Sequence, residues 1–87
     1  MLLELKFIHG TNGTEIEIEV EDDVTLQEIL EQLAAQPDPG FINPGHNWQC
    51  MLKLPDSSRL LDNTLSLKAN NVPTNGSIIL NSVIIGG

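Results

Sequence analysis

The sequence has few of the residues that bind polyanions or cross membranes. Only 4 basic residues stand against 12 acidic ones, a formal charge of −8, which excludes the basic face that nucleic-acid phosphates require. No apolar run approaches the roughly 20 residues of a membrane-spanning helix. The first ten residues lack the pattern of a secretory signal. We therefore expect a soluble, cytoplasmic protein that binds neither nucleic acid nor membranes.

Residues that could carry catalysis or hold a metal are equally scarce. The single cysteine, Cys50, excludes an internal disulfide, and it alternates with Trp48 and Leu52, which predicts a buried side chain. His9 and His46 lie far apart, with no cysteine or carboxylate at the spacing of a metal site. No serine or threonine has the neighbours of a catalytic nucleophile. We expect no enzyme, no metal and no bound cofactor.

Two alternating segments predict strands at the start of the chain. Residues 15–21 read Glu-Ile-Glu-Ile-Glu-Val-Glu, and residues 2–8 alternate in the same way. Asn12-Gly13 lies between them and readily adopts the positive φ angles of a tight turn. The sequence therefore predicts an antiparallel hairpin.

A helical pattern follows the hairpin. Thr25 to Glu28 forms a capping box, in which the Thr25 hydroxyl accepts from the Glu28 amide. Apolar residues then recur at helical spacing. Pro37 opens a proline-rich loop over residues 37–47, so we expect the helix to end near Ala35 or Gln36.

The second half of the chain predicts further strands. Residues 48–54 alternate, Asn75-Gly76 marks a second tight turn, and residues 78–85 form the last strand. Leu60, Leu61, Leu65 and Leu67 are expected to supply core across a short strand and one helical turn. The expected buried residues include Leu3, Leu5, Ile16, Ile18, Leu26, Ile29, Leu33, Leu52, Leu65 and Ile79. Leu54 is expected on the same side of its strand as Leu52.

This order of elements predicts an α+β fold of the β-grasp type. Such a fold has a mixed sheet of four to five strands with one main helix packed on it, and the last strand lies parallel beside the first.

The ordered set of features resembles ubiquitin and its bacterial relatives over nearly the whole chain. The resemblance rests on the Glu-rich second strand, the Asp-rich turn before a threonine cap, and Leu61-Asp62 followed by Thr64-Leu65-Ser66. It continues through residues 76–80 and closes with Gly86-Gly87. It implies one ubiquitin-like domain over residues 1–87, with residues 84–87 as a flexible tail.

The resemblance also implies a function, that of a protein modifier joined to its target by an isopeptide bond. Gly87, preceded by Gly86, would be adenylated by an activating enzyme that uses ATP, carried as a thioester and attached to a target amine. The implied partners are the activating enzyme, a conjugating enzyme, a deconjugating peptidase and a protein target. Residues 83–85 are Val-Ile-Ile, where ubiquitin carries arginines, which implies a dedicated activating enzyme.

Partner binding is expected on an outward apolar face. Its candidate residues are Leu2, Ile8, Met51, Lys53, Val83 and Ile85. Lys53 holds the outward position that resembles the apolar centre of ubiquitin's binding face.

Two alternatives to the modifier stay open. The apolar tail before Gly86-Gly87 resembles that of the sulfur carriers of thiamine and molybdopterin synthesis, in which Gly87 would become a thiocarboxylate. The other alternative is a non-covalent β-grasp binding module in which the glycines are incidental.

Overall fold

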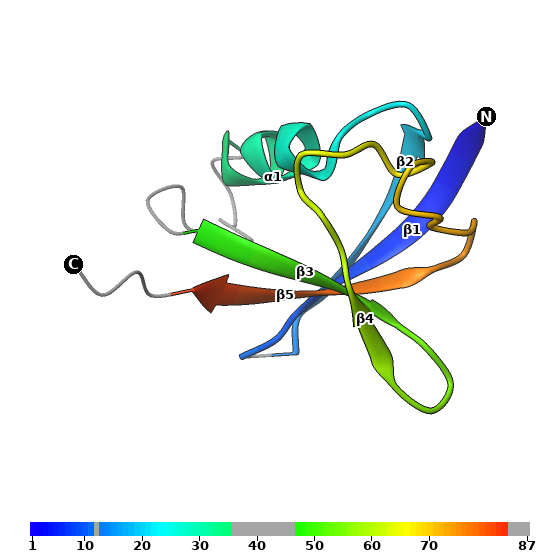
Figure 1. The fold of residues 1–87 in the computed structure, drawn as a ribbon. Helices are drawn as coiled ribbons and strands as arrows, with labels where there is room; N and C mark the ends of the chain where they lie inside the picture. The colour runs from blue at the N-terminus through cyan, green and yellow to red at the C-terminus, as the bar shows by residue number, and fades with distance from the viewer. Residues whose placement is uncertain (12, 36–46, 84–87) are drawn as a thin grey trace.

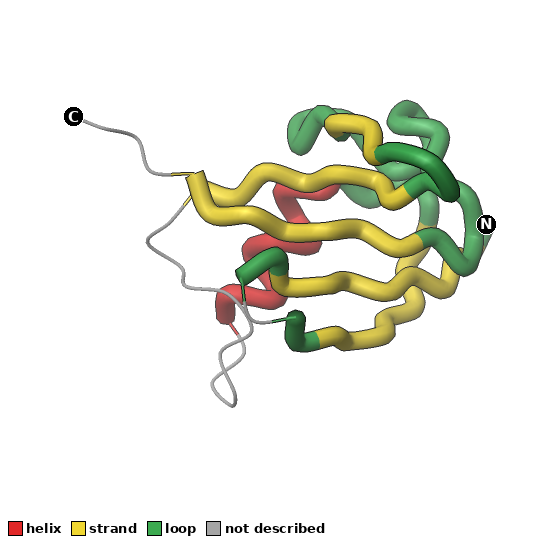
Figure 2. The backbone as a smooth tube through the Cα atoms, turned by 90° about the horizontal axis from the view of Figure 1, so that it is seen from below, coloured by secondary structure: helices red, strands yellow, loops and turns green. Residues whose placement is uncertain are grey.

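The computed structural model describes residues 1–11, 13–35 and 47–83, which form a five-stranded mixed sheet with one helix (Figure 1). The strand order across the sheet is β2-β1-β5-β3-β4. Figure 2 shows the strands side by side with the helix behind them, so one face of the sheet is covered and the other is open. The elements are β1 (Leu2–His9), β2 (Glu15–Glu21), α1 (Leu26–Ala35), β3 (Asn47–Lys53), β4 (Ser58–Leu60) and β5 (Ser77–Val83).

The middle of the sheet joins the first strand to the last. β1 pairs antiparallel with β2, where Leu5 faces Ile18, and parallel with β5, where Ile8 faces Ile79. On its other side β5 pairs antiparallel with β3, where Met51 faces Ile79. The predicted hairpin and the predicted parallel pairing of the first and last strands are both confirmed, and together with α1 they make a β-grasp sheet.

The helix begins where the sequence places its cap. The backbone N–H of Glu28 donates to Thr25 Oγ1 at 3.2 Å, which confirms the predicted cap. The N–H groups of Leu26 and Gln27 donate to carbonyl oxygens of Leu65 and Asn63 in the loop before β5, at 3.3 and 3.0 Å. These bonds satisfy donors that a helix cannot satisfy within itself. The helix ends at Ala35, as predicted, and no helix in the described ranges is long and apolar enough to span a membrane.

The core lies between α1 and the covered face of the sheet. Ile16 and Ile18 are only partly buried, because β2 is an edge strand and has a neighbouring strand on one side alone. The other expected core residues that the structure buries are Leu3, Leu5, Leu26, Ile29, Leu33, Leu52 and also Cys50, Leu61 and Leu67.

The prediction that Ile79 is buried in the core is wrong. In β5 the inward positions are taken by Ile78 and Leu80, both fully buried, so Ile79 points to the open face and is half-buried there. Two adjacent isoleucines leave the phase of a strand ambiguous, and the sequence prediction assigned the wrong one to the core.

Three leucines are exposed, of which Leu60 and Leu65 were expected in the core and Leu54 on the same side of its strand as Leu52. Leu54 and Leu60 are 37% and 57% exposed, the first because β3 ends before it and the second because it lies on the outward side of the edge strand β4. The predicted helical turn is present at residues 66–70, where the Asn70 N–H donates to the Ser66 carbonyl at 3.0 Å, but Leu65 lies before it, in a separate turn, and is 43% exposed. Asp62 Oδ1 builds that turn by accepting from the backbone N–H and the hydroxyl of Thr64, at 2.9 and 2.6 Å.

A buried asparagine organises the connection from β4 to β5. Asn70 is 5% exposed, and its Oδ1 accepts from the N–H of Asp62 at 2.9 Å. Its Nδ2 donates to the carbonyl oxygens of Asp62 and Ser66, at 2.8 and 3.1 Å. Arg59 Nη2 donates to the Asn70 carbonyl at 2.7 Å. The side chain thus replaces regular secondary structure as the source of order in this loop.

Candidate functional site

The face of the sheet turned away from α1 is the surface on which the sequence predicts partner binding. Successive side chains of a strand point to opposite faces, so every second residue of β1, β3 and β5 lies here. Ile8, Met51 and Lys53 belong to this set, as do Leu2 and Val83. None of them is fully buried, so this face can make contacts with another molecule.

An apolar row crosses four strands of this open face. Ile8 of β1 pairs with Ile79 of β5, Ile79 pairs with Met51 of β3, and Met51 pairs with Leu60 of β4. Directly opposed residues have their Cβ atoms about 4.5–5.5 Å apart, close enough for these side chains to form one continuous strip. We call these four residues, Ile8, Ile79, Met51 and Leu60, the apolar row.

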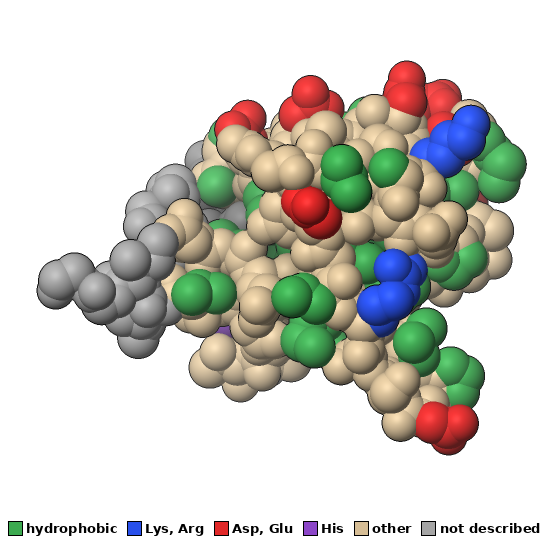
Figure 3. Space-filling model, viewed as in Figure 1, with side chains coloured by type: hydrophobic (Ala, Val, Ile, Leu, Met, Phe, Trp, Pro, Cys, Tyr) green, Lys and Arg blue, Asp and Glu red, His purple; other side chains and the backbone are tan. Residues whose placement is uncertain are grey.

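Polar side chains frame the apolar row. Lys6 lies two residues before Ile8, and its Nζ is 3.6 Å from the Glu15 carboxylate. Lys53 lies two residues after Met51, and on the other side Gln49 pairs with Asn81. Figure 3 shows the molecule from the side, with α1 at the top, and several acidic side chains gather along its upper rim. The surface can therefore bury a modest apolar contact with polar groups around it.

The predicted partner-binding residues are only partly brought together. Ile8 and Met51 meet through Ile79, with Lys53 beside them. Val83 is 41% exposed at the end of β5, four residues beyond Ile79, which is about 13 Å along a strand. Leu2 is 50% exposed at the opposite end of β1, about 20 Å from Ile8 by the same rise. These two residues lie outside the apolar row.

The residues predicted to be activated lie outside the described ranges. These are Gly86 and Gly87, together with Ile85 of the predicted partner-binding set. The described chain ends at Val83, the last residue of β5, whose pairing partner is Asn47 of β3.

Two residues of the apolar row, Ile79 and Leu60, were missed as candidates because the sequence prediction assigned both to the core. Asn81 could have indicated that Ile79 points outward. It lies two residues after Ile79, on the same side of the strand, and an asparagine favours the outward face. Leu60 could be placed only from its pairing with Met51, which depends on tertiary structure.

The described residues include one thiol, and it lies in the core. Cys50 is fully buried, and burial raises the pKa of its thiol to about 12, so the predicted core role is confirmed. Within residues 1–11, 13–35 and 47–83, no group of three or more His, Cys, Asp or Glu side chains could hold a metal ion.

Comparison with known proteins shows similarity in structure alone. No family model and no curated protein matches the sequence. The C-terminal ubiquitin-like domain of mouse tubulin-specific chaperone e is similar, with 17% identity, 100% of this chain and 92% of that chain covered, and a TM-score of 0.76. The ubiquitin of Caldiarchaeum subterraneum covers 100% of both chains at 20% identity, with a TM-score of 0.63. A designed protein based on ubiquitin covers 99% of this chain and 96% of its own at 22% identity, with a TM-score of 0.71.

The chain therefore has the ubiquitin-like β-grasp fold. At identities of 17 to 22% these similarities show the fold alone.

Proposed function

We propose that this protein is a ubiquitin-like modifier that is activated at Gly87 and joined to amines of a protein target. The observation that carries the proposal is a ubiquitin-like fold whose central strand, β5, is followed in the sequence by Ile84-Ile85-Gly86-Gly87. Glycine has no Cβ, which suits a chain end that must pass through a narrow channel to a nucleotide.

The proposed chemistry uses the carboxylate of Gly87 as its acyl source. That carboxylate attacks the α-phosphorus of ATP on a dedicated activating enzyme, and pyrophosphate leaves. A thiolate of the enzyme then attacks the acyl carbon, AMP leaves and a thioester forms. Finally an amine of the target attacks the thioester, the thiol leaves and an amide bond remains. The modifier itself supplies neither a base nor a nucleophile, in agreement with the inert Cys50.

In this proposal the apolar row docks the activating and conjugating enzymes. Its members are half-buried or exposed, and they come from β1, β3, β4 and β5, so the body of the domain holds them in fixed positions. The tail would carry the chemistry and the row would carry recognition. The two parts can then be changed separately.

The test of the chemistry is intact-mass and gel analysis of tagged protein from its native host. The full chain should yield adducts whose mass equals that of the modifier plus a target minus one water. Deleting Gly87 or making Gly86→Val should abolish the adducts. Both variants should melt like the parent, because the described core is built from residues between Leu3 and Leu80, all of them before the changed positions.

The matched control is the same chain prepared with a C-terminal amide in place of the acid. It has identical side chains but no carboxylate to adenylate, so it should form neither adenylate nor thioester with the activating enzyme and ATP. Adducts formed by the amide, or by the chain without both glycines, would contradict the proposal. A mass gain equal to one oxygen replaced by one sulfur, with no protein adduct, would identify a sulfur carrier instead.

Recognition is tested by Met51→Glu, which places a charge in the middle of the apolar row. Met51 is half-buried on the open face, so the domain should still fold. We expect thioester formation to slow, with normal rates for the control Gln27→Glu on the exposed surface of α1. Equal rates for both variants would remove the apolar row from the proposal.

A second candidate function is a non-covalent protein-binding module. It is favoured by the similarity to the ubiquitin-like domain of mouse tubulin-specific chaperone e. In that case the chain without Gly86 and Gly87 would keep its partner and its role in the host, whereas Met51→Glu would lose both.

A further inference from the structure

β2 forms one edge of the sheet, with β1 on one side and no strand on the other in the described structure. Two hydrogen bonds, one at each end of β2, show which of its residues bond to β1. His9 N–H donates to the Thr14 carbonyl at 2.8 Å, and Asp22 N–H donates to the Met1 carbonyl at 3.0 Å. Antiparallel pairs alternate along a ladder, so the even-numbered residues of β2 bond to β1. The N–H and C=O groups of Glu15, Glu17 and Glu19 consequently point away from the sheet.

The same glutamates form a ladder of negative charge on the open face of this edge. Glu15, Glu17 and Glu19 are exposed, and Glu4 of β1 directly faces Glu19. Like charges that face each other across two strands destabilise a sheet. Lys6 is the cation that the described hairpin places among them, and it pairs with Glu15 at 3.6 Å. The negative charge at this edge is only partly neutralised.

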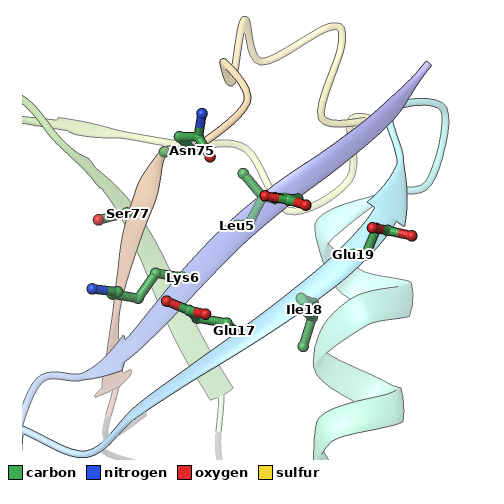
Figure 4. A pocket seen from close by; sticks show the side chains of 9 residues that line it. Leu5, Lys6, Glu17, Ile18, Glu19, Asn75 and Ser77 are labelled. Atoms are coloured by element: carbon green, nitrogen blue, oxygen red, sulfur yellow. The ribbon is translucent and has the colours of Figure 1, made fainter.

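Figure 4 shows how these side chains lie. Lys6, Glu17 and Glu19 project from β1 and β2 on the side away from α1, whereas Ile18 points toward the helix. Lys6, Glu17 and Glu19 line a shallow hollow together with Glu4, Asn75 and Ser77. Three of the residues that line the hollow, Glu4, Glu17 and Glu19, carry carboxylates that can accept hydrogen bonds or pair with cations.

On the covered side, the edge leaves apolar side chains incompletely buried. Ile16, Ile18 and Val20 pack against the core but stay half-buried, because no strand lies beyond them. One edge therefore offers three complementary features: free backbone groups, carboxylates on one face and apolar side chains on the other. Each of them is matched by one kind of ligand, an extended chain that alternates basic and apolar residues.

We propose that the edge of β2 binds an extended segment of a partner protein in which basic and apolar residues alternate, adding it to the sheet as a further strand. The backbone of the segment bonds to Glu15, Glu17 and Glu19. Its lysines or arginines lie beside the glutamate ladder on the open face, and its apolar residues cover Ile16 and Ile18. Strand addition of this kind takes its affinity from the main chain and its specificity from alternate side chains.

Charge selects this partner over other occupants of the edge. A second copy of β2 would bring one glutamate ladder against another, and like charges suppress such pairing. A nucleic acid would present phosphates to the same carboxylates. The inference is independent of Gly87, since it concerns a different element of the fold from the tail.

The test uses a blocked peptide as long as β2, 7 residues, with the sequence Lys-Val-Lys-Val-Lys-Val-Lys. It is titrated into the isotopically labelled full chain at low ionic strength and followed by amide chemical shifts and hydrogen exchange. The amides of Glu15, Glu17 and Glu19 should become protected. Unchanged exchange at these three amides in the presence of saturating peptide would overturn the proposal.

Variants separate specific pairing from general charge. Glu17→Gln with Glu19→Gln should weaken binding about fivefold or more, since each cross-strand charge pair makes a modest contribution. The matched control, Glu31→Gln with Asp56→Asn, removes the same charge from exposed sites outside β1 and β2 and should change affinity less than about twofold. Equal weakening by the two pairs would overturn the proposal.

A peptide with alternate backbone amides methylated tests strand addition directly. It keeps every charge and side chain but cannot donate to the edge carbonyls. We expect it to lose binding, and affinity equal to that of the parent peptide would show charge attraction alone and overturn the proposal.

Discussion

Replacing Asn70 by leucine tests whether one buried amide holds the connection between β4 and β5 in place. Asn70 is the buried polar residue of the described core, with three hydrogen bonds of 2.8 to 3.1 Å to Asp62 and Ser66. Leucine is close to asparagine in shape and fits a buried site, but it supplies neither donor nor acceptor. The N–H of Asp62 would lose its partner, whereas the carbonyls of Asp62 and Ser66 would each lose one of two donors and keep the backbone N–H of Leu65 and of Asn70, at 3.2 and 3.0 Å.

The expected loss follows from these three bonds. A hydrogen bond contributes about 0.5–1.5 kcal/mol net, and a buried group left unpaired costs about 1–3 kcal/mol. Asp62 is exposed and Ser66 half-buried, so water can replace part of what is lost. Leucine also adds apolar burial. We therefore expect Asn70→Leu to destabilise the protein by about 2–4 kcal/mol, which lowers the Tm by about 10–25 °C for a domain of this size.

The assay is denaturant unfolding followed by fluorescence of Trp48, the single tryptophan, which is 8% exposed in the fold. The control is Asn71→Gly at the next position, where the side chain is exposed and φ is 57°. Glycine adopts that conformation without strain, so the control should change stability by less than about 0.5 kcal/mol. A loss of the same small size for Asn70→Leu would refute the reasoning.

A second variant, Asn70→Asp, distinguishes loss of hydrogen bonds from loss of shape. One carboxylate oxygen would face the carbonyl oxygens of Asp62 and Ser66, so the fold should raise the pKa of the introduced carboxyl. With a raised pKa, the carboxyl stabilises the fold at low pH, where it is protonated. This stabilisation is lost as the pH rises through the pKa of the unfolded chain and then that of the folded protein. The stability difference from the parent should therefore shrink on acidification. A difference that does not change with pH would contradict the hydrogen-bond assignment.

Three further perturbations test the core and its surroundings. Ile29→Ala should cost about 2–5 kcal/mol, because Ile29 is 1% exposed beneath the helix, whereas Glu31→Ala on the exposed side should cost less than about 0.5 kcal/mol in the same unfolding assay. Gly10→Ala should destabilise by about 1–3 kcal/mol, since its Cβ would lie 2.9 Å from the Leu80 carbonyl oxygen; an unchanged melting curve would show that the strand ends move apart freely. Burial raises the pKa of the Cys50 thiol to about 12, so this thiol should resist alkylation at pH 9 until denaturant is added. Above pH 9 the folded state should lose stability, because the thiol ionises in the unfolded chain and stays protonated in the folded one. Rapid labelling of the native protein would place the thiol at the surface.

The first half of the fold could be predicted from the sequence because its signals are local. The two strands of the hairpin alternate strictly, and the Thr25 cap and Pro37 bracket the helix within a residue of its observed bounds. Each signal depends on neighbouring residues alone. The parallel pairing of β1 with β5 then followed from the order of elements and the preferred handedness of crossovers.

The second half depends on interactions that a local pattern does not contain. Ile78 and Ile79 are adjacent and equally apolar, so the phase of β5 is set by the covered core and not by composition. Leu65 lies just before the helical turn that begins at Ser66, in a turn that the Asp62 and Asn70 side chains hold by hydrogen bonds to Thr64 and to the Asp62 carbonyl. Short polar side chains that bond to the backbone compete with regular structure, and here they prevail.

The candidate site shows the same division between local and tertiary information. The outward direction of Ile8 and Met51 follows from alternation in β1 and β3, and the sequence predicted it. Their proximity depends on the register of both strands against β5, where Ile79 lies between them. Register is fixed by which residues enter the core, so an error in the phase of β5 removed the central member of the apolar row.

The arrangement of the sheet keeps the proposed activities apart. β5 lies at the centre, hydrogen-bonded to β1 on one side and β3 on the other, so the strand that leads to the tail is held by neighbours on both sides. The apolar row ends at Ile8 of β1, which faces Glu15 of the glutamate ladder on β2, whereas Met51 and Leu60 lie on the other side of β5 from the ladder. A change in Gly87, at Met51 or at Glu17 and Glu19 therefore acts on a different part of a fold that remains intact. Three separable phenotypes are the consequence: loss of acyl transfer, loss of enzyme docking and loss of strand addition.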